Sequence, residues 1–270
     1  MPLTALKNLA KKVLPGPASW WASWKLRQAL ERYHGDLRRE MAAKLFGRSV
    51  NRAVMGGPFA GMAYIDDTVW GPIAPKWIGT YELELWPVWK TVGSAGYTAF
   101  VDVGCAEGYY AVGLARTLDT PVYAFDLDAF ARRQCRRLAR LNGVEKKVIV
   151  AAKFDPQMLS RLRRGKKLVL MDVEGAELEL LDGREAQFYR DCDVVVEVHP
   201  REDRSIDAMV GILQGRFEAS HLVECYNQIP RRLKDAADHV RRLLGDSDTG
   251  RGMDEGRSYP QKWLWMRSRS

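Results

Sequence analysis

The sequence has no apolar run near the roughly 18 residues that a membrane-spanning helix needs. Its N-terminus is basic but lacks the apolar core and small-residue cleavage site of a signal peptide. Only 4 cysteines occur among 270 residues, none in a CxxC pair or with the spacing of zinc ligands. We therefore expect a cytoplasmic protein with reduced thiols and no structural zinc site.

The net charge of +8 is concentrated at the N-terminal end. Residues 1–60 carry eleven basic residues against three acidic ones, which accounts for the whole net charge. A helical pattern over 3–14 is followed by a second one over 18–46 that begins with a tryptophan cluster. We expect residues 1–60 to form a basic helical extension. A basic helix with a tryptophan cluster, as in residues 1–24, can lie on an anionic membrane surface. The alternative is that the tryptophans pack on the main domain.

From residue 98 onward, short apolar runs alternate with helical patterns. Five β–α units predict a parallel sheet covered by helices on both faces. Two later strands close one edge, with a charged helical insertion at about 229–244 between them. The expected domain covers residues 61–270, with its core at 98–217. The expected strands are 99–104, 121–126, 147–152, 167–173, 193–198, 220–226 and 261–266. A helix is expected over 174–181, after the fourth of these strands.

The turn after the first of these strands has the features of a ligand-binding loop. It reads Asp102-Val103-Gly104-Cys105-Ala106-Glu107-Gly108 and leads into a helix. In open α/β sheets, ligands bind beyond the carboxyl ends of the strands, and glycines let the backbone approach them closely. Asp126 ends the next strand, where a carboxylate accepts hydrogen bonds from ribose hydroxyls. Together they predict a nucleoside-containing cofactor.

The spacing and charge of this turn exclude the common nucleotide cofactors. Three residues separate Gly104 from Gly108, whereas a dinucleotide fingerprint needs G-x-G-x-x-G and a P-loop needs G-K-[S/T]. The turn contains no lysine or arginine that could face a phosphate, and Asp102 and Glu107 would repel a pyrophosphate. These acids suit a ligand with a sulfonium and an amino group, which favours S-adenosylmethionine.

Several segments resemble a known methyltransferase family. VDVGCAEGYYAVGLAR at 101–116 is similar to motif I of the class I methyltransferases, with Ala106 in place of the usual middle glycine. GTYELELW at 79–86, VLMDVEGAELELLDG at 169–183 and VVVEVHP at 194–200 resemble the FkbM family more narrowly. This resemblance implies a Rossmann-like class I methyltransferase fold and S-adenosylmethionine as cofactor. Its most specific part is DVEGAE at 172–177.

The resemblance also implies which residues bind the cofactor. The turn after the first strand would pass beneath the methionine part, and residues after the next two strands would hold the ribose and adenine. Phe154 is equally compatible with an ordinary core position. The implied cofactor-binding residues are Tyr81, Glu82, Asp102, Gly104, Cys105, Ala106, Gly108, Asp126, Leu127, Phe154 and Asp172.

The methyl acceptor is expected at the ends of the fourth and fifth strands, where Asp172, Glu174, Glu197 and His199 occur. Methyl transfer from a sulfonium is an in-line displacement, so the protein mainly positions the acceptor and excludes water. A hydroxyl acceptor must also lose its proton, and an imidazole titrates near about pH 6.5. His199 is therefore the expected general base, with Glu174 as the alternative base and Asp172 beside them. The competing interpretations are a structural histidine and an acid that only stabilises a helix N-terminus.

No metal site is expected. Some class I O-methyltransferases hold Mg²⁺ with carboxylates at these strand ends, and Asp172, Glu174 and Glu197 offer suitable oxygens. The asparagine and the second aspartate of such sites are not evident in this sequence.

The resemblance implies O-methylation of a hydroxyl on a small-molecule or glycan-type acceptor. One alternative is an RNA or other nucleic-acid methyltransferase that uses the basic extension. The chain lacks the Asn/Asp-Pro-Pro-aromatic motif of amino-group methylation, so nucleic acid is not the expected partner. The other alternative is a catalytically inactive binding protein of the same fold; the intact Asp102, Gly104, Gly108 and Asp126 argue against it.

Overall fold

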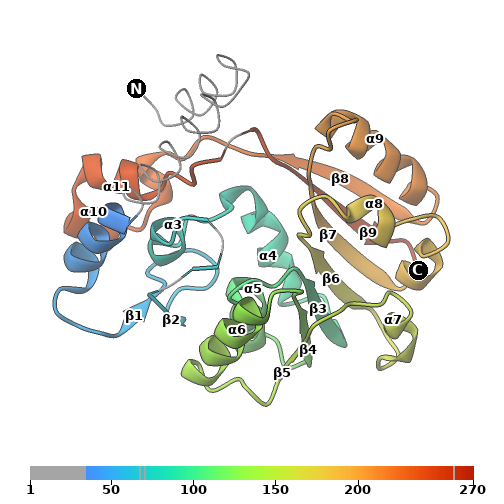
Figure 1. Cartoon of the computed structure of the whole chain (residues 1–270), viewed down its shortest axis with the longest axis horizontal. Helices are drawn as coiled ribbons and strands as arrows, with labels where there is room; N and C mark the ends of the chain where they lie inside the picture. The colour runs from blue at the N-terminus through green and yellow to red at the C-terminus, as the bar shows by residue number, and fades with distance from the viewer. Residues whose placement is uncertain (1–34, 67, 70, 258) are drawn as a thin grey trace, which may run out of the picture. The chain divides into compact units, whose positions relative to one another are not determined.

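The computed structural model describes residues 35–66, 68–69, 71–257 and 259–270 (Figure 1). The helix expected at 3–14, the first part of the one expected at 18–46 and the proposed membrane contact of residues 1–24 lie outside these ranges. Residues 35–46 are helical, as expected. Within the described ranges, no helix combines the length and the apolar character needed to cross a membrane.

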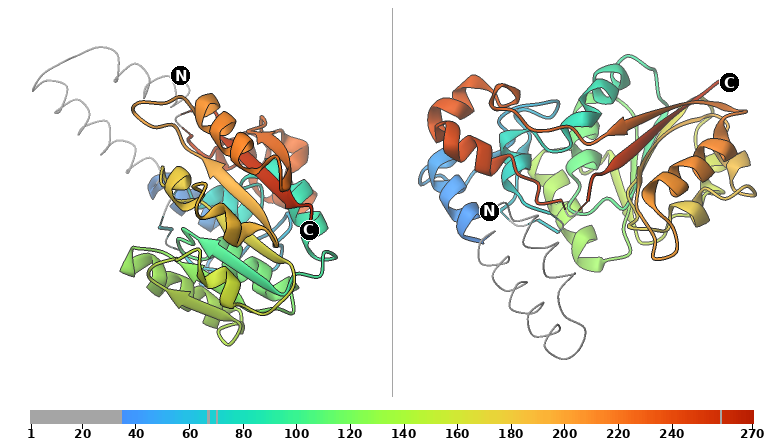
Figure 2. Two further views of the ribbon diagram at one scale, coloured as in Figure 1. Left: turned by 90° about the vertical axis from the view of Figure 1, so that its right-hand side faces the viewer. Right: turned by 90° about the horizontal axis from the view of Figure 1, so that it is seen from above.

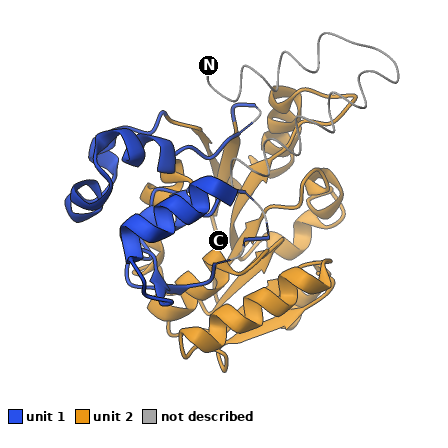
Figure 3. Ribbon diagram, turned by 60° about the vertical axis from the view of Figure 1, so that its left-hand side comes forward, with its two compact units in different colours: residues 1–81, 230–260 blue, residues 82–229, 261–270 orange. Residues whose placement is uncertain are grey.

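The chain forms two compact units (Figure 3). Unit 1 comprises the residues up to Tyr81 together with Pro230–Pro260, and unit 2 comprises Glu82–Ile229 and Gln261–Ser270. Residues 61–81 and 230–260, which the sequence groups with the methyltransferase domain, therefore belong to unit 1.

Unit 2 is built on a seven-stranded sheet with the order β5-β4-β3-β6-β7-β9-β8. The first five strands in this order pair in parallel, and β9 pairs antiparallel with both β7 and β8. This confirms the predicted, mostly parallel α/β sheet with two late strands at one edge. The strands are β3 (Ala99–Val103), β4 (Val122–Phe125), β5 (Val148–Ala151), β6 (Lys167–Met171), β7 (Cys192–Val198), β8 (His221–Asn227) and β9 (Lys262–Ser268).

Helices cover both faces of this sheet. Helices α5 and α6 lie on one side and α8 and α9 on the other (Figures 1 and 2). The central strands β3, β6 and β7 are therefore buried along their whole length, which explains why most of their residues are apolar. The helical elements of unit 2 are η1 (Leu83–Leu85), α4 (Trp86–Val92), α5 (Tyr109–Thr117), α6 (Ala129–Leu141), α7 (Met158–Arg161), α8 (Glu177–Leu180), η2 (Ala186–Tyr189) and α9 (Ile206–Phe217).

Two expected helices are shorter than their patterns indicate. The helix expected over 174–181 begins only at Glu177, because Glu174 and Gly175 have φ angles of 52° and 111°. Such angles interrupt a right-handed helix. The insertion expected as one helix over 229–244 contains η3 (Leu233–Asp235) and α10 (Asp238–Leu244), which are separated by extended backbone at Ala236 and Ala237.

Apolar side chains of the buried strands form the core of unit 2. One continuous cluster joins β3, β6, β7 and β9 to α9 and includes Val101, Met171, Val196, Leu213 and Met266. Full burial of each such side chain contributes roughly 1.5–3 kcal/mol to the free energy of unfolding. Most polar residues of this region therefore lie near or beyond the strand ends, with Asp102 and Glu197 buried within β3 and β7.

Unit 1 joins the insertion to the N-terminal helix. Arg251 of α11 (Asp246–Gly252) pairs with Glu40 at 2.8 Å, and Lys44 pairs with Asp248. A Cβ atom at Gly252 would lie 2.7 Å from Cδ1 of Ile78, in α3 (Ala74–Ile78), so glycine permits this close packing. Unit 1 also contains the short hairpin of β1 (Arg52–Ala53) and β2 (Ala63–Tyr64).

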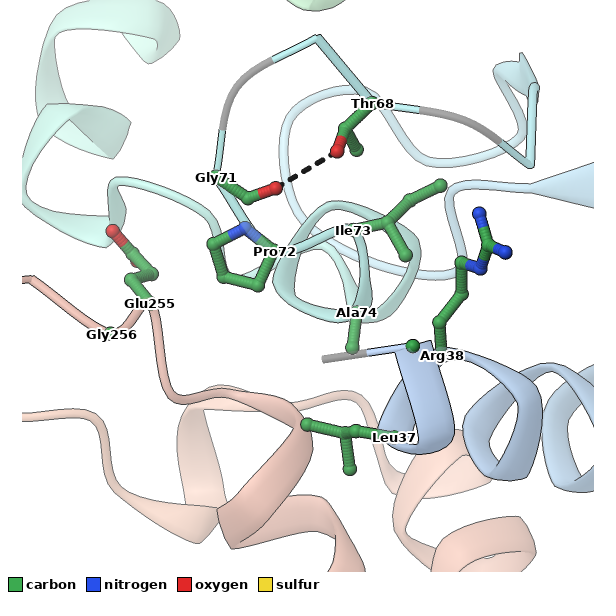
Figure 4. A pocket seen from close by; sticks show the side chains of 10 residues that line it. Leu37, Arg38, Thr68, Gly71, Pro72, Ile73, Ala74, Glu255 and Gly256 are labelled. Atoms are coloured by element: carbon green, nitrogen blue, oxygen red, sulfur yellow. Dashed lines mark hydrogen bonds between the residues drawn. The ribbon is translucent and has the colours of Figure 1, made fainter. Parts of the chain in front are cut away.

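A pocket of about 480 Å³ lies within unit 1 (Figure 4). Its lining combines apolar side chains such as Leu37 and Ile73 with Arg38 and Glu255. One rim is a turn in which the Thr68 hydroxyl donates to the carbonyl of Gly71 at 2.9 Å. The site residues expected in unit 2 are not part of this lining.

Candidate cofactor and acceptor site

The turn between β3 and α5 is shaped by a close backbone contact with the end of β6. Gly104 has a φ of 86°, and a Cβ atom there would lie 1.7 Å from the carbonyl oxygen of Asp172. Asp172 itself donates its backbone N–H to Val103 at 2.9 Å, which extends the β3–β6 pairing. Glycine is therefore required at position 104 for both conformation and space.

The second glycine of the turn begins α5. Gly108 has a φ of 95° and donates its N–H to the carbonyl of Cys105 at 2.7 Å. A Cβ atom at Gly108 would lie 2.8 Å from the sulfur of Cys135 in α6. Ala106 replaces the usual middle glycine but still adopts a left-handed φ of 47°, at a cost of roughly 1–2 kcal/mol.

Asp126 holds this turn in shape. Its Oδ2 accepts the backbone N–H of Ala106 at 2.9 Å, and its Oδ1 accepts that of Asp128 at 2.8 Å. Each carboxylate oxygen has a second lone pair, so ribose hydroxyls remain compatible with the residue. The neighbouring Leu127 is 82% exposed, whereas Phe154 is buried in the core with its ring 5.4 Å from that of Phe125. Phe154 thus occupies the core position that the sequence allows as its alternative role.

Buried acids gather beside the turn. Oδ2 of Asp102 is buried and has no hydrogen-bond partner within the described residues. Burial, reinforced by the nearby carboxylate of Asp172, raises the pKa of Asp102 to about 8. Glu82 is also buried and accepts a hydrogen bond from the hydroxyl of Tyr110. Tyr81 belongs to unit 1, where Lys76 and Arg257 lie over its ring, so its role at the cofactor stays a prediction.

The expected acceptor residues converge on one imidazole. Nδ1 of His199 lies 2.7 Å from Oε1 of Glu177, at hydrogen-bond distance. Nε2 lies 3.5 Å from Oε2 of Glu174, 3.7 Å from Oδ1 of Asp172 and 3.8 Å from Oε1 of Glu197. These three contacts are longer than direct hydrogen bonds, so within the described residues Nε2 is not committed to any one carboxylate.

The surrounding charges tune this imidazole. Burial alone would lower the pKa of His199, but the hydrogen bond to Glu177 and the negative charge of Asp172 outweigh it. The pKa of His199 is therefore raised above its ordinary value of 6.5. Ligand atoms of Asp172, Glu174 and His199 lie within 4.8 Å of one another, a spacing that would also suit a divalent cation.

Two residues of this region were not predicted as site residues. Glu177 contacts His199 directly, although the sequence singles out only Asp172 and Glu174 from the same DVEGAE segment. Tyr110 contacts Glu82 from the first turn of α5. The signal for Glu177 was present in the sequence, because it is the last acid of the segment with the most specific family resemblance.

No protein-family model and no curated protein matches this chain. Among solved structures, it is similar to the human methyltransferase 10 domain containing protein, at 10% identity and a TM-score of 0.48 over 87% of this chain and 97% of that chain. The METTL16 methyltransferase domain matches at 10% identity and a TM-score of 0.47, over 87% of this chain and 80% of that chain. A precorrin 8w decarboxylase of Methanobacterium thermoautotrophicum matches at 17% identity and a TM-score of 0.46, over 69% of this chain and 89% of that chain. TM-scores below 0.5 carry no argument about the reaction.

The sheet and its first turn define the fold class. A mostly parallel sheet with β9 antiparallel between β7 and β8, and a glycine turn after β3, has the architecture of the Rossmann-like class I methyltransferase fold that the sequence predicts. The sequence resemblance predicts S-adenosylmethionine as the cofactor. The turn fits this cofactor in charge, because the buried Asp102 has a carboxylate oxygen without a hydrogen-bond partner among the described residues.

Replacing Gly104 tests the contact between the turn and β6. Gly104→Ala and the control Gly143→Ala both place a side chain at positive φ, which costs about 1–2 kcal/mol. The space around Gly143 is open, whereas a Cβ atom at position 104 would overlap backbone. We expect urea unfolding to show a substantially larger loss of stability for Gly104→Ala, by a further 1–3 kcal/mol or so from overpacking. Equal losses would contradict the contact.

The raised pKa of Asp102 predicts that cofactor binding releases protons. Below about pH 8 the buried carboxyl is largely protonated, and a cationic ligand favours its ionised form. Affinity for S-adenosylmethionine should therefore rise with pH between 6 and 8, by up to about tenfold per unit. Calorimetry at pH 7 in two buffers of different ionisation enthalpy measures the release. Asp102→Asn should remove it and weaken binding; equal release by both proteins would refute the assignment.

Proposed function

We propose that this chain is an S-adenosylmethionine-dependent O-methyltransferase acting on a hydroxyl of a small-molecule or glycan-type acceptor. One observation supports this best: Asp172 lies against both the imidazole of His199 and the turn at 102–108, which we call the cofactor turn. The backbone of Asp172 contacts Gly104, and its carboxylate lies 3.7 Å from Nε2 of His199. A proton acceptor and the methyl-donor site therefore share one sheet edge.

The residues divide the work of methyl transfer between them. S-adenosylmethionine would supply the methyl group as an electrophile on its sulfonium. The turn around Gly104 and the carboxylate of Asp126 bind the cofactor, and Asp102 contributes negative charge to a cationic ligand. His199 accepts the proton of the acceptor hydroxyl at Nε2. The electron pair left on the acceptor oxygen forms the new bond to the methyl carbon.

The carboxylates around His199 favour this proton transfer. Asp172 and Glu174 face Nε2, and their charges stabilise the imidazolium that forms when the proton arrives. The same charges keep a share of His199 protonated, and hence inactive as a base, at low pH. Activity should therefore fall as the pH drops through the raised pKa of His199, at a value above 6.5.

Substitution of His199 tests its role as the base. We expect His199→Ala to reduce kcat by about 10²–10⁴-fold, the usual contribution of general base catalysis. Affinity for S-adenosylhomocysteine, measured by calorimetry, should change little. The control is His239→Gln, an exposed histidine of unit 1. Methyl transfer from radiolabelled S-adenosylmethionine to a panel of glycosides and phenols gives the rates; a wild-type rate in His199→Ala would disprove the assignment.

A chelation experiment separates a base from a metal ligand at this cluster. If His199 acts as the base, dialysis against EDTA should leave the transfer rate unchanged, and added Mg²⁺ or Mn²⁺ should not raise it. Loss of the rate on chelation, with recovery on adding either ion, would instead show a cation bound by Asp172, Glu174 and His199.

A further inference from the structure

Glu177 is a buried acid with a specific partner. Its side chain is fully buried at the start of α8, whereas Glu179 of the same helix is exposed and pairs with Arg201. Burial of an unpaired carboxylate costs several kcal/mol, so such a residue persists where donors satisfy it. The carboxylate of Glu177 has two donors in the candidate acceptor site; both reach Oε1, and Oε2 is buried without a hydrogen-bond partner among the described residues.

The backbone turn before α8 brings Glu177 to this position. Glu174 and Gly175 both have positive φ, and only glycine readily adopts the 111° found at 175. The N–H of Gly175 donates to Oε1 of Glu177 at 2.9 Å. The turn therefore separates the two acids, so that Glu174 is largely exposed and Glu177 is enclosed.

The second donor to Glu177 is the imidazole of His199. An ionised carboxylate only accepts hydrogen bonds, so the 2.7 Å contact places the proton of a neutral imidazole on Nδ1. The lone pair then lies on Nε2, the nitrogen that faces Asp172 and Glu174. A base needs this lone pair on the acceptor side.

We propose that Glu177 is a positioning residue, which holds His199 in the Nδ1–H tautomer, fixes its ring and stabilises its protonated form during methyl transfer. The catalytic part of this inference rests on the proposed function, in which His199 is the base. The structural part, that one carboxylate sets the tautomer and charge of this imidazole, stands on geometry alone. It also explains why this acid of the DVEGAE segment is buried.

The charges facing His199 come from several elements. Asp172 follows β6, Glu174 lies in the turn, Glu177 begins α8 and Glu197 lies near the end of β7. Of these four, only Glu177 makes a direct hydrogen bond to the ring. Removing its charge should therefore lower the pKa of His199, whereas removing the charge of Glu179, which pairs with Arg201, should not.

The first test reads the imidazole itself, without any methyl acceptor. Nitrogen-15 NMR of the histidine-labelled full chain reports tautomer and pKa, and His199→Gln identifies the His199 signals. In the wild-type protein we expect a protonated Nδ1 and a pKa above 6.5. Glu177→Gln, which keeps an acceptor but removes the charge, should lower the pKa. Glu179→Gln, on the same helix, should leave both readings unchanged.

The second test measures catalysis. Glu177→Gln should lower kcat by about 10-fold or more with little change in the acceptor KM, and should shift the acid limb of the pH profile to lower pH. Glu177→Asp keeps the charge but shortens the side chain and breaks the 2.7 Å contact. We expect it to retain less activity than the wild type and to leave the tautomers mixed. It also provides a second variant should Glu177→Gln fold poorly, as judged by circular dichroism.

These readings distinguish the two proposals. An unchanged tautomer and pKa in both Glu177 variants would overturn the positioning role, whatever the activity. A lowered pKa without methyl transfer by the wild type to any tested acceptor would support the pairing and count against the proposed function. A loss of activity with an unshifted pH profile would show that Glu177 acts only through stability.

Discussion

The carboxyl edge of the unit 2 sheet concentrates negative charge around a single imidazole. Carboxyl groups that are buried close together cannot all stay ionised unless a cation binds among them. The pKa of Asp102 is accordingly raised to about 8, and the pKa of His199 is raised above its ordinary value. The edge is therefore suited to a cationic ligand. The acids around the imidazole are Asp172, Glu174, Glu177 and Glu197, and Asp172 also lies near the buried Asp102.

This arrangement follows from the parallel topology. Strands β3, β6 and β7 are neighbours and are buried throughout, so most of their residues are apolar. Polar groups are then placed at the strand ends, which coincide in space because the strands run in the same direction. Asp172 and His199 are distant in the sequence, but they follow the adjacent strands β6 and β7, which brings Oδ1 of Asp172 within 3.7 Å of Nε2 of His199.

Features that depend on period and composition could be predicted from the sequence, including the seven-stranded sheet and the turn after β3. Features that depend on tertiary context could not. DVEGAE has the composition of a helix start, but positive φ at Glu174 and Gly175 delays the helix and sends Glu177 under His199. The packing of the 230–260 insertion depends on ion pairs such as Lys44–Asp248, and no local pattern indicates a partner 204 residues away.

The contact of Gly104 with the carbonyl of Asp172 joins the proposed donor-binding turn to the proposed acceptor residues through backbone rather than side chains. A substitution that moves either segment would disturb both functions, so neither can be redesigned separately at this point. A change of acceptor preference, whether by natural divergence or by engineering, would have to occur where the backbone is not shared. In unit 2, the exposed side chain of Glu174 and the loop beyond Pro200 meet this condition.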